Sequence, residues 1–121
     1  LSKQVVQRGI SGGVTFLGII GSVLGALIIG FLAESILHMN DLLLPLAVAG
    51  FIGSLTDSIL GAYIQAKFKC SICNEQTEDR YHCNIKSKLI SGSKWIDNDA
   101  VNFINTIIGA NVAYFLWMNY G

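Results

Sequence analysis

Three long apolar stretches constrain this chain more than any other feature. They cover residues 14–33, 42–66 and 100–118, and only one acidic or basic residue, Asp57, interrupts them. A helix needs roughly 20 mostly apolar residues to cross a bilayer. Charged residues make up 13% of the chain and hydrophobic residues 52%, a balance that excludes a disordered chain. One Pro and 13 Gly without a triplet period exclude a collagen-like sequence. We therefore expect an all-α integral membrane bundle with three transmembrane helices.

The basic residues predict the orientation of these spans. All eight Lys and Arg precede the first span or lie in the segment 67–94, and the short loop 34–41 has none. By the positive-inside rule the N-terminus and the segment 67–94 are cytoplasmic and the loop 34–41 is outside. We expect a single membrane domain over residues 1–121 in the cell membrane, and the formal net charge of zero gives no indication of a nucleic-acid partner.

The chain begins with Leu1 and enters its first span almost at once. This start predicts a fragment of a longer protein, so upstream helices or further copies of the chain are expected partners beside the lipid bilayer. Gly21 and Gly25 in the first span form a Gly-x3-Gly pair, which is typical of close helix packing.

The second span carries a small, polar face. At helical spacing this face contains Gly50, Ser54, Asp57, Gly61 and Gln65. A carboxylate at membrane depth costs at least ~2.5–3.5 kcal/mol unless it meets a partner, water or a metal. We expect Asp57 to face protein or an aqueous cavity. It either belongs to a functional site or pairs with a polar side chain to hold helices together.

The third span opens with two acids on either side of an amide, Asp97, Asn98 and Asp99. Either acid can cap the N–H groups at a helix start. An amide stripe then continues at helical spacing through Asn98, Asn102, Asn105 and Gly109. It indicates either a polar site or packing between helices. With Asp57, Asp97 and Asp99 it suggests a site for Mg²⁺ or Mn²⁺ in the cytoplasmic half of the bundle, because these cations prefer oxygen ligands.

The segment before the first span is basic and rich in glycine. Arg8, Gly12 and Gly13 belong to it. Such a loop can present backbone N–H groups to a phosphate, with the arginine as a bidentate donor. The alternative is a flexible entry into the membrane.

All three cysteines lie in the segment 67–94, with a histidine beside the last. The pattern C-x2-C-x8-H-C offers four ligands, Cys70, Cys73, His82 and Cys83. In a reducing cytoplasm this pattern favours a structural zinc over free thiols or a disulfide. Because His82 and Cys83 are adjacent, both can bind one tetrahedral ion only through a tight turn. Four protein ligands would leave no open position for catalysis.

Three motifs resemble one membrane family when they are taken in order. They are Arg8–Thr15 (RGISGGVT), Gly50–Gln65 (GFIGSLTDSILGAYIQ) and Ser91–Phe103 (SGSKWIDNDAVNF). Together they resemble the transmembrane protein 19 family, also catalogued as domain of unknown function 92. Its plant relatives include the phytyl-phosphate kinase of tocopherol synthesis, which makes a prenyl diphosphate from a prenyl monophosphate and a nucleoside triphosphate.

The resemblance implies a prenyl-phosphate kinase, an isoprenoid transferase that uses magnesium, and it supplies a set of site residues. The expected catalytic residues are Asp57, Asp97, Asn98, Asp99 and Asn102. The expected substrate-binding residues are Arg8, Gly12, Gly13 and Gln65. The alternative is a membrane protein without enzymatic activity, either a transporter or a helix-packing scaffold.

Overall fold

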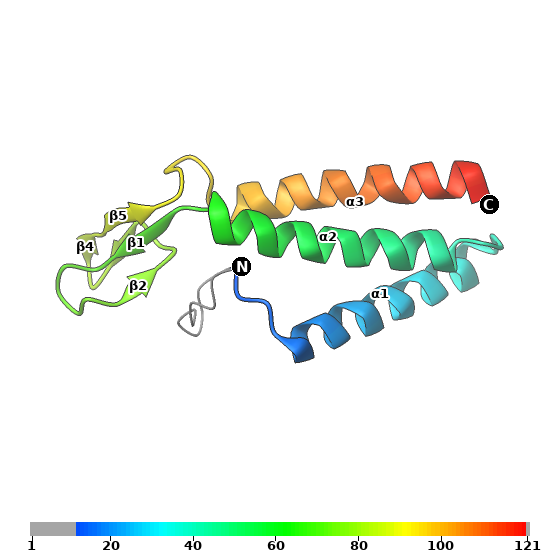
Figure 1. Cartoon of the computed structure of the whole chain (residues 1–121), viewed down its shortest axis with the longest axis horizontal. Helices are drawn as coiled ribbons and strands as arrows, with labels where there is room; N and C mark the ends of the chain where they lie inside the picture. The colour runs from blue at the N-terminus through cyan, green and yellow to red at the C-terminus, as the bar shows by residue number, and fades with distance from the viewer. Residues whose placement is uncertain (1–11, 121) are drawn as a thin grey trace. The chain divides into compact units, whose positions relative to one another are not determined.

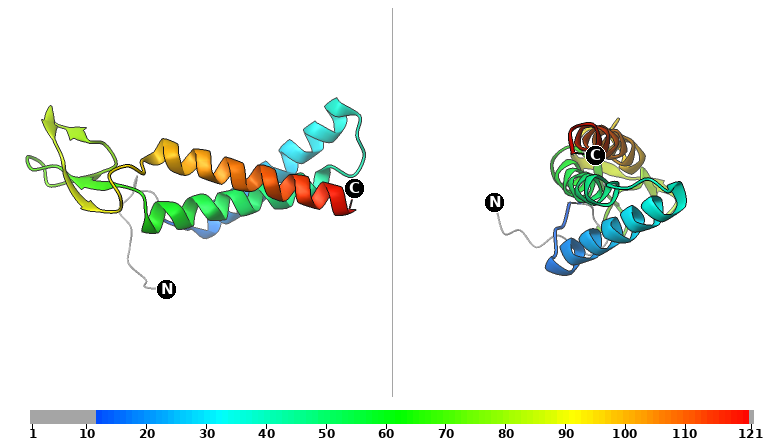
Figure 2. Two further views of the ribbon diagram at one scale, coloured as in Figure 1. Left: turned by 90° about the horizontal axis from the view of Figure 1, so that it is seen from above. Right: turned by 90° about the vertical axis from the view of Figure 1, so that its right-hand side faces the viewer.

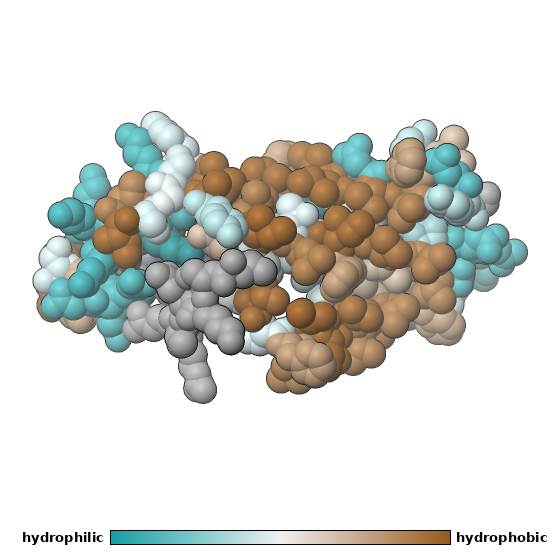
Figure 3. All heavy atoms as spheres, viewed as in Figure 1, coloured by the Kyte–Doolittle hydropathy of each residue, from teal (hydrophilic) through white to brown (hydrophobic). Residues whose placement is uncertain are grey.

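The computed structural model describes residues 12–120, and three membrane-length helices lie within them (Figure 1). They are α1 (Phe16–Leu37), α2 (Leu43–Tyr63) and α3 (Asn98–Tyr120). On the face drawn in Figure 3, hydrophobic residues predominate over the helices and hydrophilic residues over the segment between α2 and α3. The prediction of a helical membrane protein with three spans is confirmed.

The second span ends earlier than its apolar pattern indicates. We expected helix to Ala66, but α2 ends at Tyr63. The N–H of Ile64 still donates to the carbonyl oxygen of Leu60 at 2.9 Å, whereas the N–H of Ala66 donates to the carbonyl oxygen of Ile96 at 2.7 Å. The backbone has therefore left the helix before the apolar residues end.

The turn between α1 and α2 is shorter than the predicted loop. Helix α1 continues to Leu37, and His38 ends it in the left-handed conformation with φ of 52°. Glu34, expected to start the loop, lies in the last turns of α1. Its Oε1 accepts hydrogen bonds from the N–H groups of Leu42 at 3.0 Å and Leu43 at 3.2 Å. This carboxylate satisfies N–H groups that would otherwise lack partners at the start of α2.

The described chain divides into two compact units, which we treat separately. One unit contains residues 12–13 and 57–102, and the other contains 14–56 and 103–120. In the second unit helices approach each other at glycines: a Cβ added to Gly50 would lie 2.9 Å from the Cβ of Ala26. A Cβ at Gly21 or Gly25 would meet no atom within 4 Å. The close packing predicted from that pair is therefore not made among residues 12–120.

The segment between α2 and α3 forms small antiparallel sheets, although no strand was predicted there. Its strands are β1 (Lys67–Lys69), β2 (Gln76–Thr77), β3 (Tyr81–His82), β4 (Ile85–Lys86) and β5 (Lys88–Ser91). Strands β2, β1 and β5 make one sheet in that order, and β3 pairs with β4 in a hairpin. Figure 2 shows this segment in green to yellow. The side chain of Phe68 is 6% exposed and Cys70 is fully buried, so this segment has a small core.

The two ends of this segment lie side by side. Gln65 and Ser93 form a parallel bridge, and the N–H of Ser93 donates to the carbonyl oxygen of Ile64 at 3.0 Å. Gly92 between them has φ of 74°, and a Cβ at this position would overlap the carbonyl oxygen of Gln65. Glycine is required here because it accepts positive φ and has no side chain.

Candidate functional site

Asp97 caps the N-terminus of α3, as expected for one of the two acids at this helix start. Its Oδ1 accepts a hydrogen bond from the N–H of Ala100 at 3.1 Å. Asn98 is the first helical residue and Asp99 lies in the first turn. A carboxylate is favourable here because the helix dipole places partial positive charge at this end.

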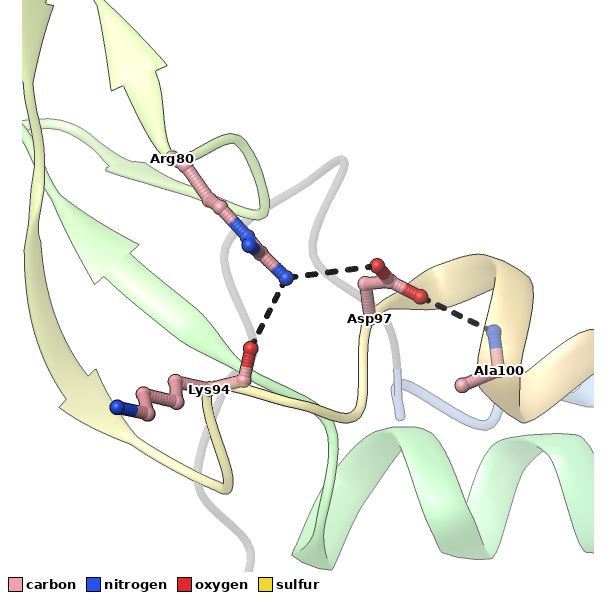
Figure 4. Close-up of polar contacts among 4 residues, drawn as sticks. All are labelled: Arg80, Lys94, Asp97 and Ala100. Atoms are coloured by element: carbon pink, nitrogen blue, oxygen red, sulfur yellow. Dashed lines mark hydrogen bonds and ion pairs between the residues drawn. The ribbon is translucent and has the colours of Figure 1, made fainter.

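An arginine from the segment between β2 and β3 reaches the same helix start (Figure 4). The Nη2 atom of Arg80 lies 3.7 Å from Oδ2 of Asp97 and donates to the carbonyl oxygen of Lys94 at 3.1 Å. The side chains of Arg80 and Asp97 are 54% and 48% exposed, so solvent screens this ion pair. Both carboxylate oxygens of Asp97 thus have protein partners.

A polar cleft of about 450 Å³ lies at this position. It is lined by Glu78, Asp79, Arg80, Asp97, Asn98 and Asp99. Carboxylate and amide oxygens are ligands for a hard cation, and a guanidinium group binds phosphate or carboxylate. The cleft can therefore hold a divalent cation together with an anion.

Three of the residues that line the cleft are not among the site residues predicted from the sequence. Glu78, Asp79 and Arg80 stand next to one another in the chain, and only this cluster of charges could have singled them out. Their approach to Asp97 depends on how the strands fold, which the sequence pattern does not reveal.

Gln65, predicted to bind substrate, is buried beside the cleft with 2% exposure. Its Nε2 donates to Oε2 of Glu78 at 2.8 Å. Gln65 therefore orients a residue that lines the cleft. The structure shows it as a support for that residue, and direct contact with a substrate stays a prediction.

The glycine-rich segment before α1 is described only from Gly12 onward. Arg8 lies outside the described residues. Gly12 has φ of 91°, and a Cβ there would overlap the backbone of Ala62 in the last turn of α2. The first and second sequence motifs therefore touch at Gly12. Gly13, the next residue of the predicted phosphate loop, is exposed.

Asp57 is half-buried in α2 and belongs to the same compact unit as the start of α3. Asn102 lies in that unit too. Both residues make further polar or electrostatic interactions. Their convergence on a common cation stays a prediction.

The amide stripe of α3 runs through both units. Asn105 and Gly109 belong with the second unit, where glycines bring helices together. A Cβ at Gly109 would lie 3.5 Å from the carbonyl oxygen of Ala49, and one at Gly53 would lie 3.7 Å from that of Asn105. Helices therefore lie against each other in this part of the stripe, at distances that a Cβ would also tolerate, and both interpretations of the stripe stay open.

The four ligands in the cysteine pattern come together in the segment between α2 and α3. The Sγ atoms of Cys70, Cys73 and Cys83 and one ring nitrogen of His82 all lie within 4.8 Å of one another. The three cysteines are free thiols. Hydrogen bonding from the backbone of Cys73, with a smaller contribution from His82, lowers the pKa of Cys70 to about 6. A side-chain hydrogen bond with Cys73 and partial desolvation raise the pKa of Cys83 to about 11.

The three spans and the polar cleft at the start of one of them define an integral membrane protein with a charged site at a helix terminus. A family model described as integral membrane protein DUF92 matches residues 1–110. The chain belongs to this family, and the resemblance drawn from the three motifs is confirmed.

Two relatives illustrate the family. The chain is 35% identical to Protein PGR of Arabidopsis thaliana over 115 residues, which cover 85% of this chain and 39% of the relative. It is 29% identical over 89 residues to an uncharacterized membrane protein of Methanocaldococcus jannaschii, covering 74% and 34% of the two chains. The chain thus spans well under half the length of these relatives. No solved structure matches it significantly.

Proposed function

We propose that this chain forms part of a membrane phosphotransferase that acts on a polyprenyl monophosphate. In this reaction an oxygen of the monophosphate attacks the terminal phosphorus of a nucleoside triphosphate. The bond to the nucleoside diphosphate breaks, and a prenyl diphosphate forms. The observation that carries the proposal is the cleft in which Arg80 and several carboxylates meet at the N-terminus of α3. Phosphoryl transfer requires mainly positioning and charge stabilisation, which such groups supply.

The oxygen donors of the cleft fit a magnesium ion. Asp79 and Asp99 are exposed carboxylates among its lining residues, and Mg²⁺ is usually bound through one or two carboxylates plus substrate phosphates. Asp97 interacts with Ala100 and Arg80, which supports a role in holding the helix start and the arginine, and its binding of magnesium stays a prediction. Asp57 remains a further proposed ligand. When bound, magnesium neutralises charge on the transferred phosphate.

The remaining site residues are assigned by the family resemblance. Arg8, Gly12 and Gly13 would bind phosphate, and the contact of Gly12 with the end of α2 supports a role for this segment near the second motif. The lipid tail would lie among the apolar helices. The basic residues outside the spans support a cytoplasmic face for the cleft, in the cell membrane.

A helix-packing scaffold is the second candidate. Close glycine contacts, such as Gly50 with Ala26 and Gly30 with the backbone of Leu43, favour it. Such contacts are typical of membrane helices that associate tightly. A scaffold needs no carboxylate in the cleft, so the two candidates differ in what substitution there would change.

The test is a phosphotransfer assay on the purified full-length protein. It uses prenyl monophosphates of several chain lengths, each nucleoside triphosphate, and magnesium or a chelator. We expect a prenyl diphosphate and a nucleoside diphosphate in equal amounts, and only with magnesium present. A folded protein that transfers phosphate to none of these acceptors would contradict the proposal.

A further inference from the structure

Two tight turns bring the cysteine and histidine side chains together. The first joins β1 to β2. In it the N–H of Cys70 donates to the carbonyl oxygen of Glu75 at 3.0 Å, and the N–H of Asn74 donates to that of Cys70 at 3.1 Å. Asn74 takes positive φ, 61°, which lets the chain reverse within a few residues. Cys70 therefore begins one compact turn and Cys73 lies within it.

The second turn explains how His82 and Cys83, although adjacent in the chain, can bind the same ion. His82 pairs with Ile85 in the β3–β4 hairpin, leaving Cys83 and Asn84 as its two-residue loop. Both have positive φ, 51° and 59°, as in a type I′ turn. The chain bends sharply directly after His82. The Sγ of Cys83 and the Nδ1 of His82 can therefore face a common point, and they are 3.4 Å apart.

The distances among the four ligand atoms match one tetrahedral metal ion. With Zn–S of about 2.3 Å and Zn–N of about 2.0–2.1 Å, tetrahedral ligands are separated by roughly 3.5–3.8 Å. The Sγ of Cys73 lies 3.4 Å from Nδ1 of His82, and no pair in the cluster exceeds 4.8 Å. Movements of the ligand atoms by a few tenths of an ångström to about 1 Å would bring all four within bonding distance of one ion.

We propose that Cys70, Cys73, His82 and Cys83 bind one structural zinc ion. Three sulfurs and an imidazole make a donor set that suits zinc and leaves no position for water or substrate. The N–H of Ile72 lies 3.4 Å from Sγ of Cys70 and donates to it. Such outer hydrogen bonds support a metal-bound sulfur. This site rests on the segment between α2 and α3 alone and does not depend on the phosphotransferase proposal.

The size of the segment explains why it needs an ion. Its strands contain two to four residues each, and Ala66, Phe68 and Cys70 are its buried hydrophobic side chains among the described residues. Such a core is too small to stabilise a fold by itself, and a structural zinc contributes folding free energy directly. The ion would also fix the residues between β2 and β3. Among them Arg80 accepts a backbone hydrogen bond from Ser87 at 2.9 Å and reaches Asp97.

The first test measures metal in the full chain, purified in detergent without chelator and with zinc in the growth medium. We expect elemental analysis to find about one zinc per chain, as for a closed four-ligand site. Cys73→Ser and Cys83→Ser, made separately, should each lose most of the zinc. Ser71→Ala changes an exposed residue of the first turn that is not a ligand, and it should keep the full content. Iron or copper in place of zinc, or equal zinc in all variants, would overturn the proposal.

A second test does not depend on the folding of variants. Zinc is removed from the unsubstituted chain under reducing conditions and replaced by cobalt. Tetrahedral thiolate coordination should produce strong visible bands and thiolate-to-cobalt charge-transfer bands that zinc then displaces. A spectrum of octahedral cobalt, or intact mass showing two hydrogens lost to a disulfide in the protein as purified, would refute the site.

Discussion

The Nη2 of Arg80 and the Oδ2 of Asp97 are 3.7 Å apart, so a residue between two short strands pairs with the residue that caps the third helix. The same carboxylate also accepts the N–H of Ala100. One side chain thus has two roles, capping and ion pairing, and substitutions can separate them.

Asp97→Ala removes both roles, whereas Asp97→Asn keeps a capping oxygen. Loss of a cap costs about 1 kcal/mol, and an exposed ion pair contributes from nearly nothing to about 1 kcal/mol. We expect the alanine variant to lose about 1 kcal/mol of unfolding free energy and the asparagine variant a few tenths. Unfolding in mixed detergent, followed by circular dichroism, measures both. Equal losses of unfolding free energy in the two variants would show that the capping hydrogen bond contributes nothing to stability.

Gly92→Ala should damage the point where the segment between α2 and α3 rejoins the helices. The new Cβ would overlap the carbonyl oxygen of Gln65, and the residue would be held at positive φ. Strain of this kind costs of order 1–3 kcal/mol. We expect a clear fall in the unfolding midpoint. Ser91→Ala, at an exposed neighbouring position, is the matched control and should leave the midpoint within error. Equal unfolding midpoints for Gly92→Ala and Ser91→Ala would contradict the close approach of Gly92 to the carbonyl oxygen of Gln65.

Asp57→Asn tests the proposed enzyme against the scaffold. The substitution preserves size and removes the charge. If Asp57 helps to hold magnesium, turnover should fall by about 100-fold or more, the range found when one electrostatic group is removed. Phosphotransfer is measured beside the unfolding midpoint and the size-exclusion profile, with Ser71→Ala as the control. Unchanged turnover, or loss of assembly alone, would count against an enzymatic role for this carboxylate.

The topology prediction places residues 67–94 in the cytoplasm and residues 34–41 outside. The native cysteines test it because all three lie in the first of these segments. A membrane-impermeant maleimide should label the protein in permeabilised cells and not in intact ones. To avoid protection by a bound metal, the labelled sites are counted in the zinc-free state of permeabilised cells. Labelling from outside intact cells would reverse the orientation.

The three spans could be predicted because each carries its signal locally, in about 20 successive residues. Their ends are harder to predict, since apolar residues persist after the backbone has left the helix. Ala66 shows this: it is buried, with 2% exposure, but its N–H bonds to Ile96 and not to α2.

The strands and half of the cleft could not be predicted for a different reason. Alternation over two or three residues, as in β2 or β1, is too short to distinguish from chance. The hairpin turn at Cys83 and Asn84 lacks the usual glycine. The meeting of Arg80 with Asp97 joins residues far apart in sequence. By contrast, the four metal-ligand candidates were found from spacing alone.

The bridge between Gln65 and Ser93 holds together the two ends of the segment that carries the strands. Because the chain leaves and returns at the same place, the length of the 27 residues between these positions does not set the distance between the ends of the two flanking spans.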